Sequence, residues 1–221
     1  MAGDPLSRLT AIGLLVYYLV MGAAVATQTR YMTPIVPLLA VLEAAMIAAV
    51  ARRVFQDRGR ATIAFLVAML VLAAEPLASA VAHDRLAART DTRVLATRWL
   101  AEHATVGANV RVLGSRFWPW GVPQIPPTLH VVDVPPTPDA LAAAKVAYVV
   151  THDHTLFSSH VPPAMMATLA PRLHLLADFD PFVPGRAGEA VFEMSDAYYI
   201  PVHGFAAVTR PGPHVRIYAF E

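Results

Sequence analysis

The residues best placed to do chemistry are the two histidines of His152-Asp153-His154, which follow an apolar segment at 146–151. In an extended segment, residues two apart face the same side, so both imidazoles could reach one metal ion, and His160 could complete the site from the next turn. The alternative is a surface turn with solvated imidazoles, because this spacing lacks a fixed third ligand. We expect no metal and no other cofactor, with His152 and His154 as the candidate ligands if a metal does bind.

A second candidate is the aromatic, proline-rich loop at 116–127, which contains Trp118 and Trp120. It follows a predicted strand, and ligands of open α/β sheets gather beyond the carboxyl ends of the strands. The two tryptophans could stack on a sugar, dip into a membrane interface or pack beneath the loop as core. The sequence leaves these three roles open.

Several kinds of chemistry are excluded by what the sequence lacks. The chain has no cysteine, so it forms no disulfide, thiol nucleophile or cysteine-ligated zinc site. It has no glycine-rich phosphate loop, nucleophile elbow or diagnostic carboxylate pair, so its catalytic residues stay unknown. A formal charge of +1, from 17 basic and 16 acidic residues, excludes a nucleic-acid binder held by a broad basic field.

The elements that must position these residues fall into two regions. Hydrophobic residues make up 56% of the chain and charged residues only 15%, against about 25% charged in a typical soluble domain. Three apolar segments, at 9–27, 32–51 and 61–82, each approach the roughly 20 residues that cross a bilayer. The sequence therefore predicts a transmembrane helical region over 1–82 and a separate domain over 83–221.

Arginine placement predicts how the chain is oriented. Four arginines lie at 52–60, between the second and third apolar segments, whereas Arg30 is the only one between the first and second. The positive-inside rule then places 52–60 in the cytoplasm and the 83–221 domain outside the cell membrane. A rival interpretation makes 9–26 a signal peptide, because Ala24-Val25-Ala26 resembles a cleavage site.

Three places in this region need an explanation. Glu43 lies near the middle of the second segment, where a carboxylate must be paired or protonated, so it is either functional or hydrogen-bonded inside a bundle. Either role suggests further transmembrane helices from another chain. Arg30 and Tyr31, at the outer boundary, could hold a lipid phosphate or simply anchor the helix. Pro76, next to Glu75, is expected to kink or end the third span.

The 83–221 region predicts a small α/β domain. Asp91 can cap a helix that runs to His103. Further helices are predicted at 138–144 and 163–169, and strands at 110–114, 129–133, 146–151, 173–178 and 215–220. The apolar runs are too continuous for a sheet that is buried on one face only. The fold class is thus a membrane anchor of about three transmembrane helices followed by an extracytoplasmic α/β domain.

Two stretches resemble the C-terminal portion of the GT-C membrane glycosyltransferases, which include protein O-mannosyltransferases and lipid A aminoarabinose transferases. The run from Arg30 to Pro37, Arg-Tyr-Met-Thr-Pro-Ile-Val-Pro, is similar to the Arg-Tyr-x-x-Pro-x-x-Pro start of a late span in that group. The 91–112 segment looks like the first helix and strand of the extracytoplasmic domain that follows the last span.

The resemblance implies a transferase that moves a sugar from a polyprenyl-phosphate carrier, with Arg30 at the carrier phosphate. The family's catalytic acid lies in the first extracytoplasmic loop, but the loop at 28–31 has no carboxylate. The chain therefore looks like the tail of such an enzyme, expected to be inactive alone. The alternative is a membrane-anchored extracytoplasmic scaffold or binding module without catalysis.

Overall fold

The computed structural model describes residues 5–23, 33–114, 122–156, 159–193 and 199–221. By its internal contacts the chain divides into two compact units, Met1–Ala78 and Ser79–Glu221, which are described separately below. Four of the residues singled out from the sequence, Arg30, Tyr31, Trp118 and Trp120, lie outside the described residues.

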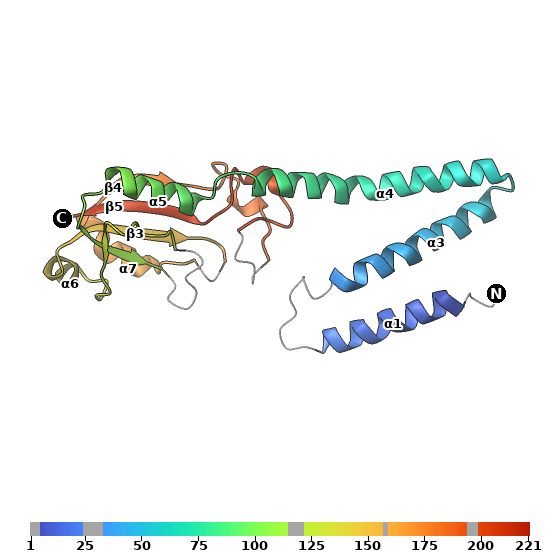
Figure 1. Cartoon of the computed structure of the whole chain (residues 1–221), viewed down its shortest axis with the longest axis horizontal. Coiled ribbons are helices and arrows are strands. Elements are labelled where there is room, and N and C mark those ends of the chain that lie inside the picture. Colours follow the sequence, from blue (N-terminus) through green and yellow to red (C-terminus); the bar gives the residue numbers. More distant parts are fainter. Residues whose placement is uncertain (1–4, 24–32, 115–121, 157–158, 194–198) are drawn as a thin grey trace. The chain divides into compact units, whose positions relative to one another are not determined.

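The first unit is built from helices α1 (Pro5–Gly22), α3 (Val36–Val54) and the start of α4 (Arg58–Ala87) (Figure 1). Proline at the first turn of α3 fits a helix start, where the missing N–H has no partner to lose. The carboxylate of Asp57 accepts a hydrogen bond of 2.8 Å from the Arg60 N–H at the beginning of α4. Helix α4 continues through Pro76, so of the two effects expected of this proline, a kink or an end, the end is wrong.

Among the described residues, one helical stretch is long and apolar enough to cross a membrane, and it begins at Arg58. Only 6% of its apolar window is buried. Arg8–Gly22 is a shorter apolar helix by the same measure. Large side chains stay exposed along these helices, including Leu9 at 68% and Leu70 at 73%. The first unit therefore presents apolar side chains outward rather than enclosing them in a core.

The second unit contains a mixed five-stranded sheet of order β2-β1-β3-β5-β4 (Figure 1). Its strands are β1 (Asn109–Leu113), β2 (His130–Val131), β3 (Val146–Asp153), β4 (Leu173–Phe179) and β5 (His214–Phe220). Strands β2, β1 and β3 are parallel, whereas β5 is antiparallel to both β3 and β4. The α/β fold predicted from the sequence is confirmed.

Helices cover both faces of this sheet. On one face α5 (Thr92–His103) packs against β1, β3 and β5 through a cluster that includes Leu100 and Val150. On the other face α6 (Pro138–Ala143) and α7 (Pro163–Leu169) pack through a cluster that includes Val149. Val149 and Val150 point to opposite faces, and both are fully buried. Burial on both sides explains why the strand is continuously apolar.

Candidate ligand-binding site

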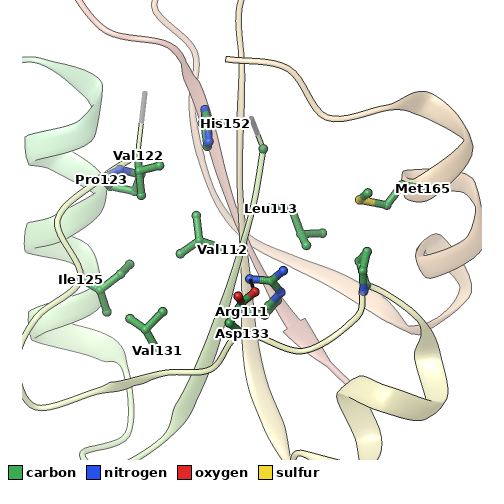
Figure 2. A pocket seen from close by; sticks show the side chains of 12 residues that line it. Arg111, Val112, Leu113, Val122, Pro123, Ile125, Val131, Asp133, His152 and Met165 are labelled. Carbon is green, nitrogen blue, oxygen red and sulfur yellow. Dashed lines mark ion pairs between the residues drawn. The ribbon is translucent and has the colours of Figure 1, made fainter. Parts of the chain in front are cut away.

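A cavity of about 780 Å³ lies at the carboxyl end of β1. Figure 2 shows the residues that line it, from β1 and from the segments beside it. They are Arg111, Val112, Leu113, Gly114, Val122, Pro123, Ile125, Val131, Asp133, Pro136, His152 and Met165. A volume of this size falls within the range of about 300–1,000 Å³ that is usual for small-molecule sites.

The strand pairing explains why a cavity forms here. Strand β2 pairs with β1 only at Asn109 and Val110, so no described strand pairs with the rest of β1 on that side. On its other side β1 pairs with β3 as far as Leu113. The chain leaves β1 towards β2 on one side and returns to β3 on the other, so the strand order reverses at β1. Such a reversal opens a crevice at the carboxyl ends of the strands, where α/β proteins bind ligands.

Gly114 and His152 both line this cavity and pack against each other. The backbone of Gly114 has φ +155°, and a Cβ at this position would overlap the imidazole of His152. Glycine therefore lets the ring pack directly against the main chain where β1 ends. The position of the imidazole depends on the absence of a side chain at residue 114.

The imidazole of His152 is buried and has no hydrogen-bond partner in the described part of the chain. Its exposed fraction is 0%, and both Nδ1 and Nε2 lack a partner. Burial lowers the pKa of His152 from 6.5 to about 4, and nearby Arg93 lowers it further while Asp153 opposes the change. The ring is therefore neutral at neutral pH and offers one N–H donor and one nitrogen acceptor.

The other polar group of the cavity is an ion pair. Arg111 Nη1 lies 3.0 Å from Asp133 Oδ1. The Arg111 side chain is only 9% exposed, whereas that of Asp133 is 71% exposed. Figure 2 places this pair and His152 at opposite ends of the labelled group, with Val112 and Leu113 between them. The two charges cancel, so the described part of the lining carries no net charge.

His154 lies in an aromatic cluster rather than in the cavity lining. Its ring centroid is 5.4 Å from that of Phe182, 4.4 Å from that of Phe192 and 5.0 Å from that of Tyr199. Its Nδ1 accepts a hydrogen bond of 3.2 Å from the Leu156 N–H. Burial lowers the pKa of His154 to about 4 as well. These contacts make His154 part of the packed interior.

The alternative of a solvated histidine turn is therefore wrong, since His152 is 0% and His154 only 8% exposed. The reason is that β3 continues to Asp153, two residues beyond the predicted strand, and carries His152 into the packed sheet. No cluster of three or more histidine or acidic side chains suited to a metal occurs among the described residues. His160 instead places Nδ1 3.4 Å from Asp153 Oδ1 at the surface.

Arg111 and Asp133 were not among the candidate site residues predicted from the sequence. A lone arginine within the apolar segment 110–113 was the available signal, because a charged residue in a buried strand needs a partner. Glu43, which the sequence placed inside the membrane, is exposed on α3.

A second, smaller cavity of about 480 Å³ lies within the first unit, where α3 ends and α4 begins. Its described lining is Ala48, Arg52, Arg58, Ala61, Thr62 and Phe65. Two arginines thus face a hollow between the two helices.

No protein-family model, no curated protein and no solved structure matches this chain.

Proposed function

We propose that this chain is a multi-pass protein of the cell membrane whose α/β unit lies on the extracytoplasmic side. We further propose that it acts as the C-terminal part of a GT-C type glycosyltransferase, which takes its sugar from a polyprenyl-phosphate carrier. The observation that carries the proposal is the outward-facing apolar surface of the helical unit, joined to a folded domain that contains a ligand-sized cavity.

The exposed apolar side chains support a membrane location. Leu66, Leu70 and Val71 of α4 are 59%, 73% and 67% exposed, and Val41 and Met46 of α3 are each 62% exposed. A monomeric soluble protein rarely leaves so continuous an apolar surface in water. In a bilayer the same side chains meet lipid, and the helix backbone satisfies its own hydrogen bonds. We therefore take α1, α3 and α4 as the three spans.

The arginines support the orientation. Arg52 and Arg53 lie in the last turn of α3, and Arg58 and Arg60 lie in the first turn of α4. All four fall at the same helix–helix junction, and positive charge of this kind is retained on the cytoplasmic side. Because α4 then crosses the bilayer once, the α/β unit emerges on the extracytoplasmic side.

Glu43 supports a larger assembly. Its side chain is exposed on α3 and makes no hydrogen bond or ion pair with any residue that the structure describes. A carboxyl group at that depth needs a proton or a partner, because the hydrocarbon core offers no water. A helix of another chain would supply the partner, as expected if this chain completes a transferase whose remaining spans are encoded elsewhere.

Within such an enzyme the α/β unit binds rather than catalyses. The only carboxylate in the described cavity lining is Asp133, and Arg111 already holds it. The acid that activates the acceptor would therefore come from the partner chain. Arg30 and Tyr31 would hold the carrier phosphate, and the cavity would position an acceptor. The same lack of an acid also fits the second candidate, a membrane-anchored binding module without catalysis.

Cysteine labelling tests the membrane assignment directly, because the chain has no cysteine of its own. Thr128→Cys in the α/β unit should react with an impermeant maleimide in intact cells. Gln56→Cys, between α3 and α4, should react only after the cells are opened. Both positions are exposed, so accessibility within the fold does not limit the reaction. The opposite pattern would reverse the orientation, and release of the chain by alkaline carbonate would remove the membrane assignment.

Co-isolation and activity separate the transferase from the binding module. The full chain, extracted in mild detergent, should co-isolate with a polytopic protein, and sugar transfer by that complex should require both chains. Glu43→Leu should leave insertion intact but weaken co-isolation, whereas Met46→Leu on the same helix should not. Unchanged transfer by the partner without this chain would favour the binding module.

A further inference from the structure

We infer that the cavity at the junction of α3 and α4 binds the phosphate headgroup of an anionic phospholipid through Arg52 and Arg58. The inference rests on the proposed membrane location of the helical unit, and its site is separate from the cavity of the α/β unit. It is supported by the residues that line the cavity and by the way in which the two helices present them.

The lining comes from one face of each helix. On α3 it consists of Ala48 and Arg52, which are four residues apart. On α4 it consists of Arg58, Ala61, Thr62 and Phe65. The spacing i, i+3, i+4, i+7 of these four residues is that of a single helix face. Two of the described lining residues are alanines, and their small side chains leave room between the longer ones for a cavity of about 480 Å³.

Both arginines have hydrogen-bond donors available to a ligand. Arg52 donates its Nε–H to the Ala48 carbonyl across 3.1 Å, and its Nη groups make no hydrogen bond or ion pair with a described residue. The same is true of the whole Arg58 guanidinium. Asp57, its acidic neighbour in the chain, lies outside the described lining, and its carboxylate accepts from the Arg60 N–H. Since a guanidinium presents paired N–H donors that match two phosphate oxygens, the cavity suits a phosphate group.

The apolar end of the cavity favours a lipid over a free phosphate. Arg58 and Phe65 are separated along α4 by about 10 Å, at 1.5 Å per residue. Ile63 and Leu66, on either side of Phe65 in the sequence, are 63% and 59% exposed. In the proposed membrane location the arginines lie at the level of the headgroups, and Phe65 lies closer to the hydrocarbon. A phospholipid offers the matching arrangement, a charged phosphate at one end and acyl chains at the other.

Arg53 and Arg60 provide an internal comparison. They belong to the same junction, but neither lines the cavity. One step along a helix turns a side chain by about 100° and two steps by about 200°, so both point away from the helix faces that line the cavity. General attraction between basic residues and an anionic membrane surface would involve all four arginines alike. Binding in the cavity depends on Arg52 and Arg58 alone.

Lipid binding to the full chain, purified in dodecyl maltoside, tests the inference. Dioleoyl phosphatidylglycerol is the anionic probe, and dioleoyl phosphatidylcholine has the same acyl chains without the net charge. Native mass spectrometry should show that the first phosphatidylglycerol binds about tenfold more tightly than phosphatidylcholine, as expected for hydrogen bonds between charged groups. The double variant Arg52→Gln with Arg58→Gln should lose this preference. The double variant Arg53→Gln with Arg60→Gln removes the same charge and should keep it. Glutamine forms helices nearly as well as arginine and all four positions are exposed, so both variants should fold.

Three results would overturn the inference. Equal affinity of the wild type for the two lipids would exclude an anion site. An equal loss of preference in both double variants would assign the binding to general surface charge. Full displacement of phosphatidylglycerol by millimolar glycerol 3-phosphate would show that the phosphate alone is the ligand. The proposed membrane location fails separately, through release of the chain by alkaline carbonate, so a chain that resists carbonate but shows no lipid preference would refute this inference alone.

Discussion

The stability of the α/β unit should fall as the pH is lowered from 6.5 towards 4, because His152 and His154 are neutral inside the fold. Burial lowers the pKa of each from 6.5, its value in the unfolded chain, to about 4. Between those two values the unfolded chain binds protons that the folded chain does not. Protonation therefore favours unfolding, and the stabilisation present above pH 6.5 is lost progressively as the pH falls.

The size of the loss follows from the gap between the folded and unfolded pKa values. A gap of one pKa unit corresponds to about 1.36 kcal/mol. Each histidine therefore lowers the free energy of unfolding by about 3 kcal/mol once the pH is below 4. Between pH 8 and pH 5 the loss is about 2 kcal/mol for each, or about 4 kcal/mol for both. Aspartate side chains titrate near pH 3.9 in unfolded chains, so this window reports mainly on the histidines. A loss of this size is a large part of the stability of an ordinary domain.

Urea unfolding of the full chain at pH 8 and pH 5, followed by tryptophan emission, measures this loss. His154→Asn keeps an acceptor for the Leu156 N–H but removes the titrating ring. It should therefore reduce the difference between the two pH values by about 2 kcal/mol. His130→Asn, at an exposed site, is the matched control and should behave like the wild type. The reasoning is refuted if His154→Asn loses as much stability between pH 8 and pH 5 as the wild type does.

Two further substitutions test the packing of the α/β unit, each by its urea midpoint at pH 8. Gly114→Ala should cost more than about 2 kcal/mol because its Cβ would overlap the ring of His152. Gly107→Ala, with φ +78° and open space around it, should cost only about 1 kcal/mol, and equal losses would argue against the overlap. Thr92→Val should cost about 1–3 kcal/mol, because the buried Thr92 hydroxyl donates a 2.6 Å hydrogen bond to the Pro213 carbonyl. A loss below about 0.5 kcal/mol would mean that water replaces this donor.

The elements of the α/β unit were predictable because their signals are local. Asp91 was expected to cap a helix, and its side chain does accept a hydrogen bond from the Arg93 N–H at the start of α5. The apolar segment at 146–151 became β3, and its burial on both faces follows from the same continuous pattern. A cap or an apolar run is set by neighbouring residues, so the sequence alone carries enough information to place it.

The cavity was not predictable, because it depends on pairings between distant parts of the chain. No residue near β1 in the sequence indicates that β2 ends at Val131, so that no described strand pairs with this side of β1 beyond Val110. The ion pair of Arg111 with Asp133 likewise requires the strand order β2-β1-β3. That His152 and His154 face the same side follows from the two-residue period of an extended segment. Their burial does not follow from it, since burial is set by the helices and loops that cover β3.

A continuous run of apolar residues has a different structural cause in each of the two units, and the length of the run distinguishes them. In β3 a short apolar run is buried on both sides, and Val149 and Val150 are fully enclosed by helices of the same unit. In α4 the run is long enough to cross a bilayer, and only 6% of it is buried by the chain itself. The helical unit therefore accounts for much of the excess of hydrophobic over charged residues in the whole chain. No part of the described fold covers that surface, and the membrane location proposed above would cover it with lipid.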